Sequence, residues 1–165
     1  MLKDNLNHVL LYVARLTLPM KVEHSLEIRV RYNETDGQGR VHHAQYLNYF
    51  ERGRVELLRS LGHSYRDFEA SGLMLVVSEM NVRYLGAAEF DDLLRVTTSV
   101  LRTRGVRIEH AYEIVKPAAG LLASERGTPE SATDQPIVKA TSVIACVDRT
   151  GKVQRLPKYM RIPTA

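Results

Sequence analysis

Hydrophobic and polar residues alternate strictly in the segment "SLEIRVRY", residues 25–32. This period of two predicts a half-buried β-strand. From about Ala44 to Leu61 the apolar residues recur at steps of three and four, with charges between them, which is typical of an amphipathic helix. Gly62 follows as a stop signal, and Ser64 begins a short second helix over residues 64–72 as its N-cap.

Strand patterns fill the rest of the chain. We expect strands over 73–84, 93–102, 106–115 and 137–147, with a turn at Gly105. Residues 117–136 are rich in Pro, Gly, Ser and Ala and are predicted to form a mobile loop. One strand, a long helix and then four strands predict an α+β domain, with the helix packed on an antiparallel sheet.

Gly53 lies in the interior of the long predicted helix. Glycine costs about 1 kcal/mol relative to alanine at such a position. A close approach by a sheet or by a partner would explain its presence.

Length and composition fit one globular domain. The chain has 165 residues, of which 44% are hydrophobic and 25% charged, enough apolar material for a core. The net charge of +4 is mild and the basic residues are scattered, so we expect no nucleic-acid partner, although a polyanionic small molecule remains attractive. The single cysteine, Cys146, lies in an apolar strand, so we expect a buried core residue, no intrachain disulfide and a cytoplasmic protein.

Residues 1–24 precede the first strand as an N-terminal extension. Its apolar part, residues 8–18, is interrupted by Arg15 and is shorter than the ~18 apolar residues of a membrane span. Asp4 and the lack of a cleavage site argue against a signal peptide. Either residues 5–16 form an amphipathic helix or translation starts at Met20.

The stretch "RYNETDGQGRVHHAQYLNYFERGR", residues 31–54, concentrates the candidate chemistry. An acid and a glycine-rich bend precede two histidines and the long helix, whose N-terminus offers unpaired N–H groups and a partial positive charge. A lone Asp in such a bend usually caps a turn. Adjacent histidines rarely chelate one ion and no third ligand is suitably spaced, so we expect no metal.

This stretch, extended as "RVRYNETDGQGRVHHAQYLNYFERGRVELLR", resembles the opening of the hotdog-fold acyl-CoA thioesterases of the 4-hydroxybenzoyl-CoA thioesterase-like branch. The resemblance continues through "NVRYLGAAEFDDLLRVTTSVLRTRG" and "RLPKYM", and so covers roughly residues 25–160. The chain departs from the family pattern at Glu34, where Asp is common, at Arg40, where an apolar residue is usual, and at Gly53, where Ala is common.

The resemblance implies a hotdog fold over residues 25–160: a long central helix wrapped by a curved, five-stranded antiparallel sheet. It implies a homodimer or homotetramer in which two sheets pair edge to edge and the sites lie at the interface. No cofactor is expected, because coenzyme A is part of the substrate, and no membrane span is expected.

The resemblance also implies roles for individual residues. Asp36 would be the general base or the nucleophile, and the backbone N–H of His43 would face the thioester oxygen. The His43 side chain would either assist proton transfer or contribute nothing beyond its backbone. Glu34 would hold Arg31, tune Asp36, or be an exposed loop acid. Glu51 would supply the carboxylate, as in another hotdog branch, or pair with a nearby Arg.

Substrate contacts are assigned in the same way. Tyr46 and Phe50 would line the acyl pocket, although core packing explains them equally well. Basic residues around the Gly105 turn would bind the nucleotide phosphates of coenzyme A, or form a solvated hairpin tip; they are Arg102, Arg104 and Arg107.

The predicted function is hydrolysis of an acyl- or aroyl-CoA thioester to the free acid and coenzyme A. Two alternatives are a hotdog protein that binds acyl-CoA without cleaving it and a hotdog acyl-thioester hydratase. The acyl group, and the choice between coenzyme A and a carrier protein, stay open.

Overall fold

The computed structural model describes residues 21–118 and 133–161. The helix considered for residues 5–16 and most of the expected 117–136 loop lie outside the described residues. The elements, in chain order, are β1 (Glu23–Arg29), the 3-10 helix η1 (Tyr32–Glu34), α2 (Gln45–Ser60), α3 (Tyr65–Ala70), β2 (Leu73–Tyr84), β3 (Leu93–Arg104), β4 (Arg107–Lys116), β5 (Gln135–Asp148) and the 3-10 helix η2 (Lys158–Met160).

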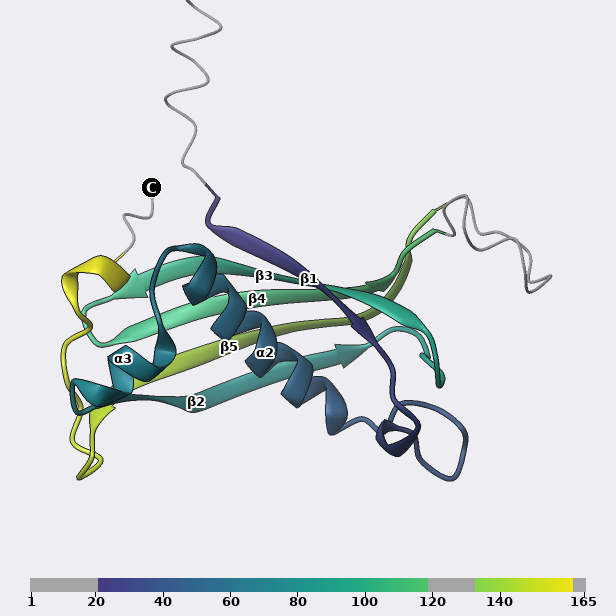
Figure 1. Cartoon of the computed structure of the whole chain (residues 1–165), viewed down its shortest axis with the longest axis horizontal. Helices are drawn as coiled ribbons and strands as arrows, with labels where there is room; N and C mark the ends of the chain where they lie inside the picture. Colours follow the sequence, from purple (N-terminus) through teal and green to yellow (C-terminus); the bar gives the residue numbers. More distant parts are fainter. Residues whose placement is uncertain (1–20, 119–132, 162–165) are drawn as a thin grey trace, which may run out of the picture.

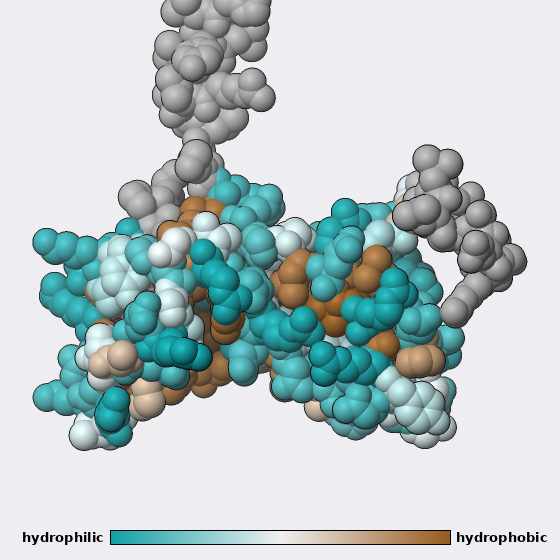
Figure 2. Space-filling view, viewed as in Figure 1, coloured by the Kyte–Doolittle hydropathy of each residue, from teal (hydrophilic) through white to brown (hydrophobic). Residues whose placement is uncertain are grey.

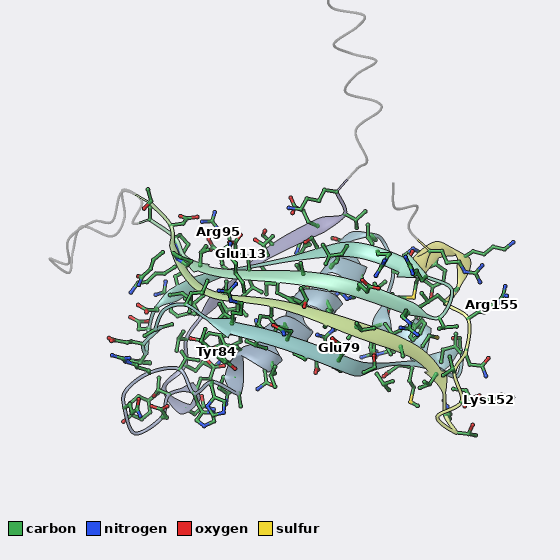
Figure 3. The ribbon with its side chains drawn as sticks, turned by 180° about the vertical axis from the view of Figure 1, so that it is seen from behind. Glu79, Tyr84, Arg95, Glu113, Lys152 and Arg155 are labelled. Carbon is green, nitrogen blue, oxygen red and sulfur yellow. The ribbon has the colours of Figure 1, made fainter. Side chains whose placement is uncertain are left out.

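The five strands form one antiparallel sheet in the order β1-β3-β4-β5-β2. The long helix α2 lies across one face of this sheet and packs mainly on β1 and β3 (Figure 1). The other face carries charged side chains, among them Arg95 and Glu113 (Figure 3). The division into one packed and one polar face is usual for an antiparallel sheet, and the expected α+β hotdog architecture is confirmed.

The main core lies between α2 and the sheet, because each contributes one apolar face. It includes the fully buried side chains of Phe50, Leu94, Val96, Ile114 and Ile137. A second cluster under α3 contains Phe68, Leu156 and Cys146. The prediction that Cys146 is a buried core residue is confirmed.

Most predicted boundaries hold to within two residues. Gly62 ends the α2 region with a φ of +82°, and the Ser64 Oγ accepts the Asp67 N–H at 3.3 Å, as expected for an N-cap. The first strand is the exception, because it ends at Arg29 rather than residue 32. Tyr32 was expected on the buried face, yet it lies in η1 with 79% of its surface exposed.

Gly53 has the close neighbour that its position in a helix suggested. A Cβ atom added there would lie 2.2 Å from the Oγ1 of Thr98, on β3. The backbone of α2 therefore approaches the sheet more closely than any other residue would allow, so the prediction of a close approach by a sheet is confirmed.

The strand registers show which parts of the chain lie at the same end of the sheet. β2 is the edge strand beyond β5, and its register runs from Leu73↔Asp148 to Tyr84↔Val138. Its Leu73 end lies at the same end of the sheet as the Gly105 turn, and its Tyr84 end reaches the loop before α2. The candidate residues are therefore divided between two ends of the sheet.

Within the parts of the chain that the structure describes, no helix is long and apolar enough to span a bilayer. On the helix side of the molecule, polar side chains surround apolar ones that are visible in hollows between them (Figure 2).

Candidate functional site

The loop between β1 and α2 is a closed hairpin that carries Asp36. An isolated antiparallel bridge joins Thr35 to Val41, and the Asp36 N–H donates to the Arg40 carbonyl at 2.8 Å. Gly39 has a φ of +75°, which glycine adopts without strain. The hairpin thereby holds Asp36 beside the start of α2.

The Asp36 carboxylate is half-buried and uses one oxygen within its own turn. Its Oδ1 accepts the Gln38 N–H at 2.8 Å. Its Oδ2 has no hydrogen-bond partner among the described residues. The side chain therefore caps the turn, as a lone Asp usually does, and still presents one oxygen for chemistry.

The segment that enters α2 leaves the His43 backbone N–H without an acceptor among the described residues. The His42 carbonyl accepts the Gln45 N–H at 2.9 Å, and the His42 Nδ1 accepts the Ala44 N–H at 3.3 Å. Within residues 21–118 and 133–161, nothing accepts the His43 N–H. A free N–H in the first turn of a helix is suited to binding a developing negative charge.

Aromatic residues hold this helix entry in place. The Tyr84 hydroxyl donates to the His43 carbonyl at 3.2 Å, and the rings of His43 and Tyr84 meet edge to face at 6.4 Å. The Tyr46 ring lies 5.8 Å from that of Tyr84. Burial raises the pKa of Tyr46 to about 12, so it stays protonated. Tyr46 thus lies at the site while also belonging to the core.

Glu34 holds Arg31, as one of the alternatives proposed, but it does so through the Arg31 backbone, and it also bonds Tyr49. Its Oε2 accepts the Tyr49 hydroxyl at 2.8 Å and the Arg31 backbone N–H at 2.7 Å. Its own carbonyl accepts the His42 N–H at 2.9 Å. Burial and this carboxylate raise the pKa of Tyr49, which remains a donor. Glu34 therefore ties the Asp36 loop to α2.

The remaining predicted contacts are dispersed. Phe50 is fully buried and packs on Tyr112 with ring centroids 4.6 Å apart, so core packing accounts for it. Arg102 donates to both carboxylate oxygens of Glu109, at 2.5 and 2.7 Å from its NH2. Arg104 and Arg107 lie opposite each other at the exposed Gly105 turn.

The Arg104–Arg107 turn and the Asp36 loop lie at opposite ends of β3 (Figure 1). Twelve residues of strand span roughly 35–40 Å at about 3.3 Å per residue. The geometry of one chain therefore separates the predicted phosphate site from the predicted carboxylate.

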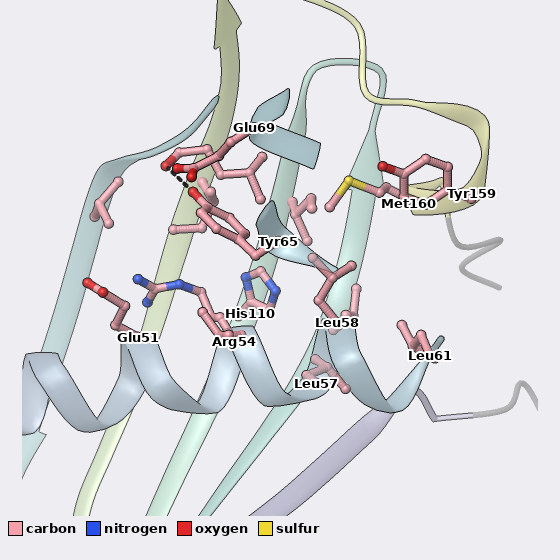
Figure 4. Close-up of a pocket in the computed structure, with 16 residues that line it drawn as sticks. Glu51, Arg54, Leu57, Leu58, Leu61, Tyr65, Glu69, His110, Tyr159 and Met160 are labelled. Atoms are coloured by element: carbon pink, nitrogen blue, oxygen red, sulfur yellow. Dashed lines mark hydrogen bonds between the residues drawn. The ribbon is translucent and has the colours of Figure 1, made fainter. Parts of the chain in front are cut away.

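A cavity of about 340 Å³ opens between α2, α3 and the β4-β5-β2 part of the sheet, and sequence reasoning did not find it (Figure 4). Its lining is mainly aliphatic, with Glu51, Arg54 and His110 among the polar exceptions. Glu51 has no ion pair among the described residues, so the expectation that it pairs with an Arg is wrong. The alternation of Ile108, His110 and Tyr112 in the sequence could have placed His110 on the inner face.

Two hydrogen bonds in series connect Arg54, at the polar part of this cavity, to Tyr112 and Ser142 on the sheet. Arg54 donates to the Tyr112 hydroxyl at 3.1 Å, and Tyr112 shares a hydrogen bond with Ser142 at 2.7 Å. Burial, with a further contribution from Arg54, lowers the pKa of His110 to about 3, so its imidazole is neutral. Its Nδ1 is buried without a hydrogen-bond partner.

Within the described part of the chain, no three His, Cys, Asp or Glu side chains are placed to share a metal ion.

The five-stranded antiparallel sheet packed on one long helix is the hotdog fold, and the comparisons with known proteins place the chain in the thioesterase class. The family model described as "Thioesterase-like superfamily" matches residues 30–163, and the chain belongs to that family.

Several similar proteins are named as thioesterases. The chain is 36% identical over 125 residues to the acyl-CoA thioesterase YbgC of Haemophilus influenzae, covering 75% of this chain and 80% of that protein. It is 28% identical over 138 residues to the acyl-acyl carrier protein thioesterase ATL3 of Arabidopsis thaliana, covering 84% and 65%. The structure of DHNA-CoA thioesterase from Staphylococcus aureus matches with a TM-score of 0.69 at 28% identity, covering 84% and 83%. The chain is a thioester hydrolase.

Proposed function

We propose that the chain hydrolyses acyl-CoA thioesters, with Asp36 as the reacting carboxylate and the His43 N–H as the oxyanion donor. The observation that carries this proposal is the closed loop between Thr35 and Val41, which leads into α2. Among the described residues, the Asp36 Oδ2 on this loop and the His43 N–H that follows it both lack a hydrogen-bond partner. The Haemophilus relative, an acyl-CoA thioesterase, supports the substrate class.

The proposed chemistry needs only these two groups and water. The Asp36 Oδ2 either takes a proton from water as that water attacks the thioester carbon, or attacks the carbon itself to give an anhydride that water opens. The thioester oxygen gains negative charge in either route, and the His43 N–H stabilises it with the partial positive charge of the helix N-terminus. The thiolate of coenzyme A leaves and is protonated, and no cofactor takes part.

The site proposed here is completed by a second copy of the chain. β2 is the edge of the sheet and exposes Val76 and Val77. If two copies pair β2 antiparallel, the Leu73 end of one strand lies beside the Tyr84 end of the other. The Arg104–Arg107 turn of one copy then approaches the Asp36 loop of its partner. A CoA molecule could bridge the two, with Arg side chains on its phosphates.

The test is thiol release from a panel of acyl-CoAs, from acetyl to palmitoyl and including benzoyl and hydroxybenzoyl esters, by the native protein and by Asp36→Asn. Asparagine keeps an oxygen for the Gln38 N–H, so the turn should persist. We expect hydrolysis of at least one ester and a loss of at least ~10²-fold in the variant.

Two controls separate the candidate groups. His43→Ala leaves the backbone N–H in place, so a backbone role predicts a loss far smaller than that of Asp36→Asn. Glu51→Gln removes the other candidate carboxylate, and we expect most of the activity to remain. If Asp36→Asn keeps full activity and Glu51→Gln loses it, Glu51 rather than Asp36 is the reacting carboxylate.

Two finer points belong to the same proposal. The Arabidopsis relative acts on an acyl-acyl carrier protein, so a carrier-protein thioester is the second candidate substrate and is added to the panel. The cytoplasm is the proposed compartment, because the single cysteine is buried and unpaired.

A further inference from the structure

The cavity under α2 and α3 has the size and shape to hold a small ligand. Its volume of about 340 Å³ lies within the range of small-molecule pockets. Lining residues on α2 extend from Glu51 to Leu61, about 15 Å along the helix at 1.5 Å per residue. An elongated apolar space of this kind suits an extended aliphatic chain better than a single aromatic ring.

The two ends of the cavity differ in chemistry. Glu51, Arg54 and His110 lie towards one end, and Leu61 and Met160 towards the other (Figure 4). At the apolar end the polar group among the residues labelled in Figure 4 is the hydroxyl of Tyr159, beside Met160, and no charged side chain among the described lining residues lies there. A ligand that fills the whole space must therefore be apolar at one end and bear a polar atom at the other.

Arg54 and His110 have unused hydrogen-bonding capacity at the polar end. Arg54 is half-buried, donates one bond to Tyr112, and has no carboxylate within ion-pair distance among the described residues. His110 is 5% exposed, and its buried Nδ1 has no hydrogen-bond partner among the described residues. Unpaired polar groups in a buried site are costly, so they indicate a ligand atom that completes them.

The charges around the cavity indicate that the completing atom is neutral. Arg54 contributes one positive charge, whereas Glu51 and Glu69 contribute two negative charges to the same lining. A carboxylate or phosphate bound in the cavity would be repelled by the negative charges of both Glu51 and Glu69. A hydroxyl or oxo oxygen accepts from Arg54 without that repulsion, and a hydroxyl can also donate to a neutral imidazole.

We propose that this cavity is the acyl site and that it selects an aliphatic acyl chain carrying a hydroxyl or oxo oxygen at the level of Arg54 and His110. The proposal rests on the thioesterase function above. In the two-copy arrangement, the Leu73 end of β2 lies beside the Tyr84 end of the partner's β2, which reaches the partner's catalytic loop. Leu75 and Val77 line the cavity and lie near this Leu73 end, so the cavity would be close to that loop.

The first test measures binding without catalysis. The probes are N-methyl amides of decanoic acid and of its 3-, 6- and 10-hydroxy derivatives, titrated calorimetrically into the full-length protein. We expect at least one hydroxylated amide to bind at least tenfold more tightly than the unsubstituted one. Equal or tighter binding of the unsubstituted amide, or no binding by any of them, would overturn the proposal.

Variants then tie the selectivity to the cavity. Arg54→Met should bring the affinities of the hydroxylated and plain amides within about threefold of each other, and Tyr112 keeps its bond to Ser142. Arg52→Met is the matched control, because Arg52 is an exposed neighbour on α2 that does not line the cavity, and it should leave both affinities unchanged. Selectivity that survives Arg54→Met contradicts the assignment.

Blocking the cavity separates this inference from the proposed function. Leu58→Trp should fill the apolar part of the cavity and abolish both binding of the ten-carbon amides and hydrolysis of long-chain acyl-CoA esters. If long-chain esters are hydrolysed as before in Leu58→Trp, the acyl site lies elsewhere although the thioesterase function stands. If the amides bind and no thioester is hydrolysed, the cavity assignment survives and the proposed function fails.

Discussion

Single residues in this chain show how a side chain can serve structure and chemistry together. Asp36 caps its own turn with one oxygen and leaves the other free, so the structural and the catalytic interpretations do not exclude each other. Glu34 bonds Tyr49 and the Arg31 backbone and thereby holds the loop on which Asp36 lies. The proposed reacting carboxylate therefore lies on a loop that is held by a second acid, whose Oε2 accepts two hydrogen bonds.

Gly53 gives the sharpest prediction at this scale. An alanine Cβ would lie 2.2 Å from the Thr98 Oγ1, so α2 or β3 would have to shift. We expect Gly53→Ala to lower the free energy of unfolding by about 1–3 kcal/mol despite the better helix propensity of alanine. Urea denaturation measures the change.

A double-mutant cycle identifies the cause. In a Thr98→Ala background the hydroxyl is gone, and Gly53→Ala should cost much less or stabilise. Asn48→Ala, at an exposed position on α2, is the control and should change stability by less than about 0.5 kcal/mol. An undiminished cost in the Thr98→Ala background would show that Thr98 is not the obstacle.

The elements explain how a cavity can exist in so small a domain. α2 packs mainly on β1 and β3, so the β4-β5-β2 part of the sheet is left to be covered by the short helix α3 and the C-terminal segment around Met160. Six residues of α3 cannot fill the space that a longer helix would occupy. The cavity thus follows from the unequal lengths of the two helices.

α3 should depend on its cap because it is only six residues long. Ser64→Ala removes the acceptor for the Asp67 N–H and should lower the free energy of unfolding by about 1 kcal/mol, whereas Ser64→Gly should cost only a few tenths. Thermal or urea unfolding measures both. Ser60→Ala, at the end of α2, removes a hydroxyl bond to the Leu57 carbonyl but no N-cap, and an equal effect there would argue against the cap.

The whole molecule raises the question of how the separated parts of the proposed site meet. In one chain the Arg104–Arg107 turn and Asp36 lie at opposite ends of the sheet, and antiparallel pairing of two β2 edges would bring them together. The exposed Val76 and Val77 on an edge strand fit such pairing, because an open edge presents unpaired backbone groups.

Mixing two defective variants tests this arrangement. One variant is Asp36→Asn, and the other is the double change Arg104→Glu and Arg107→Glu. When they are refolded together, half of the dimers should be hybrids, each with one intact site of two. We therefore expect about a quarter of the native kcat/KM, measured by thiol release at low acyl-CoA. Absence of any recovery would mean that each site lies within a single chain.

The sequence by itself determined the secondary-structure elements and the protein family. Periods of two and of about 3.6 set the strands and α2, and Gly62 and Ser64 ended and began helices where predicted, because these signals act over a few residues. The family resemblance identified the thioesterase class and the Asp36 loop from one contiguous motif. Gly53 also predicted a close contact with the helix, although the sequence did not indicate that Thr98 makes it.

Only the tertiary structure decided what depends on residues distant in the chain. The early end of β1, the bond between Glu34 and Tyr49 and the burial of Phe50 against Tyr112 each depend on a neighbour that no local pattern supplies. The cavity is the clearest case. It exists because α2, α3 and three strands enclose a volume that none of them encodes, and the unpartnered His110 has meaning only inside it.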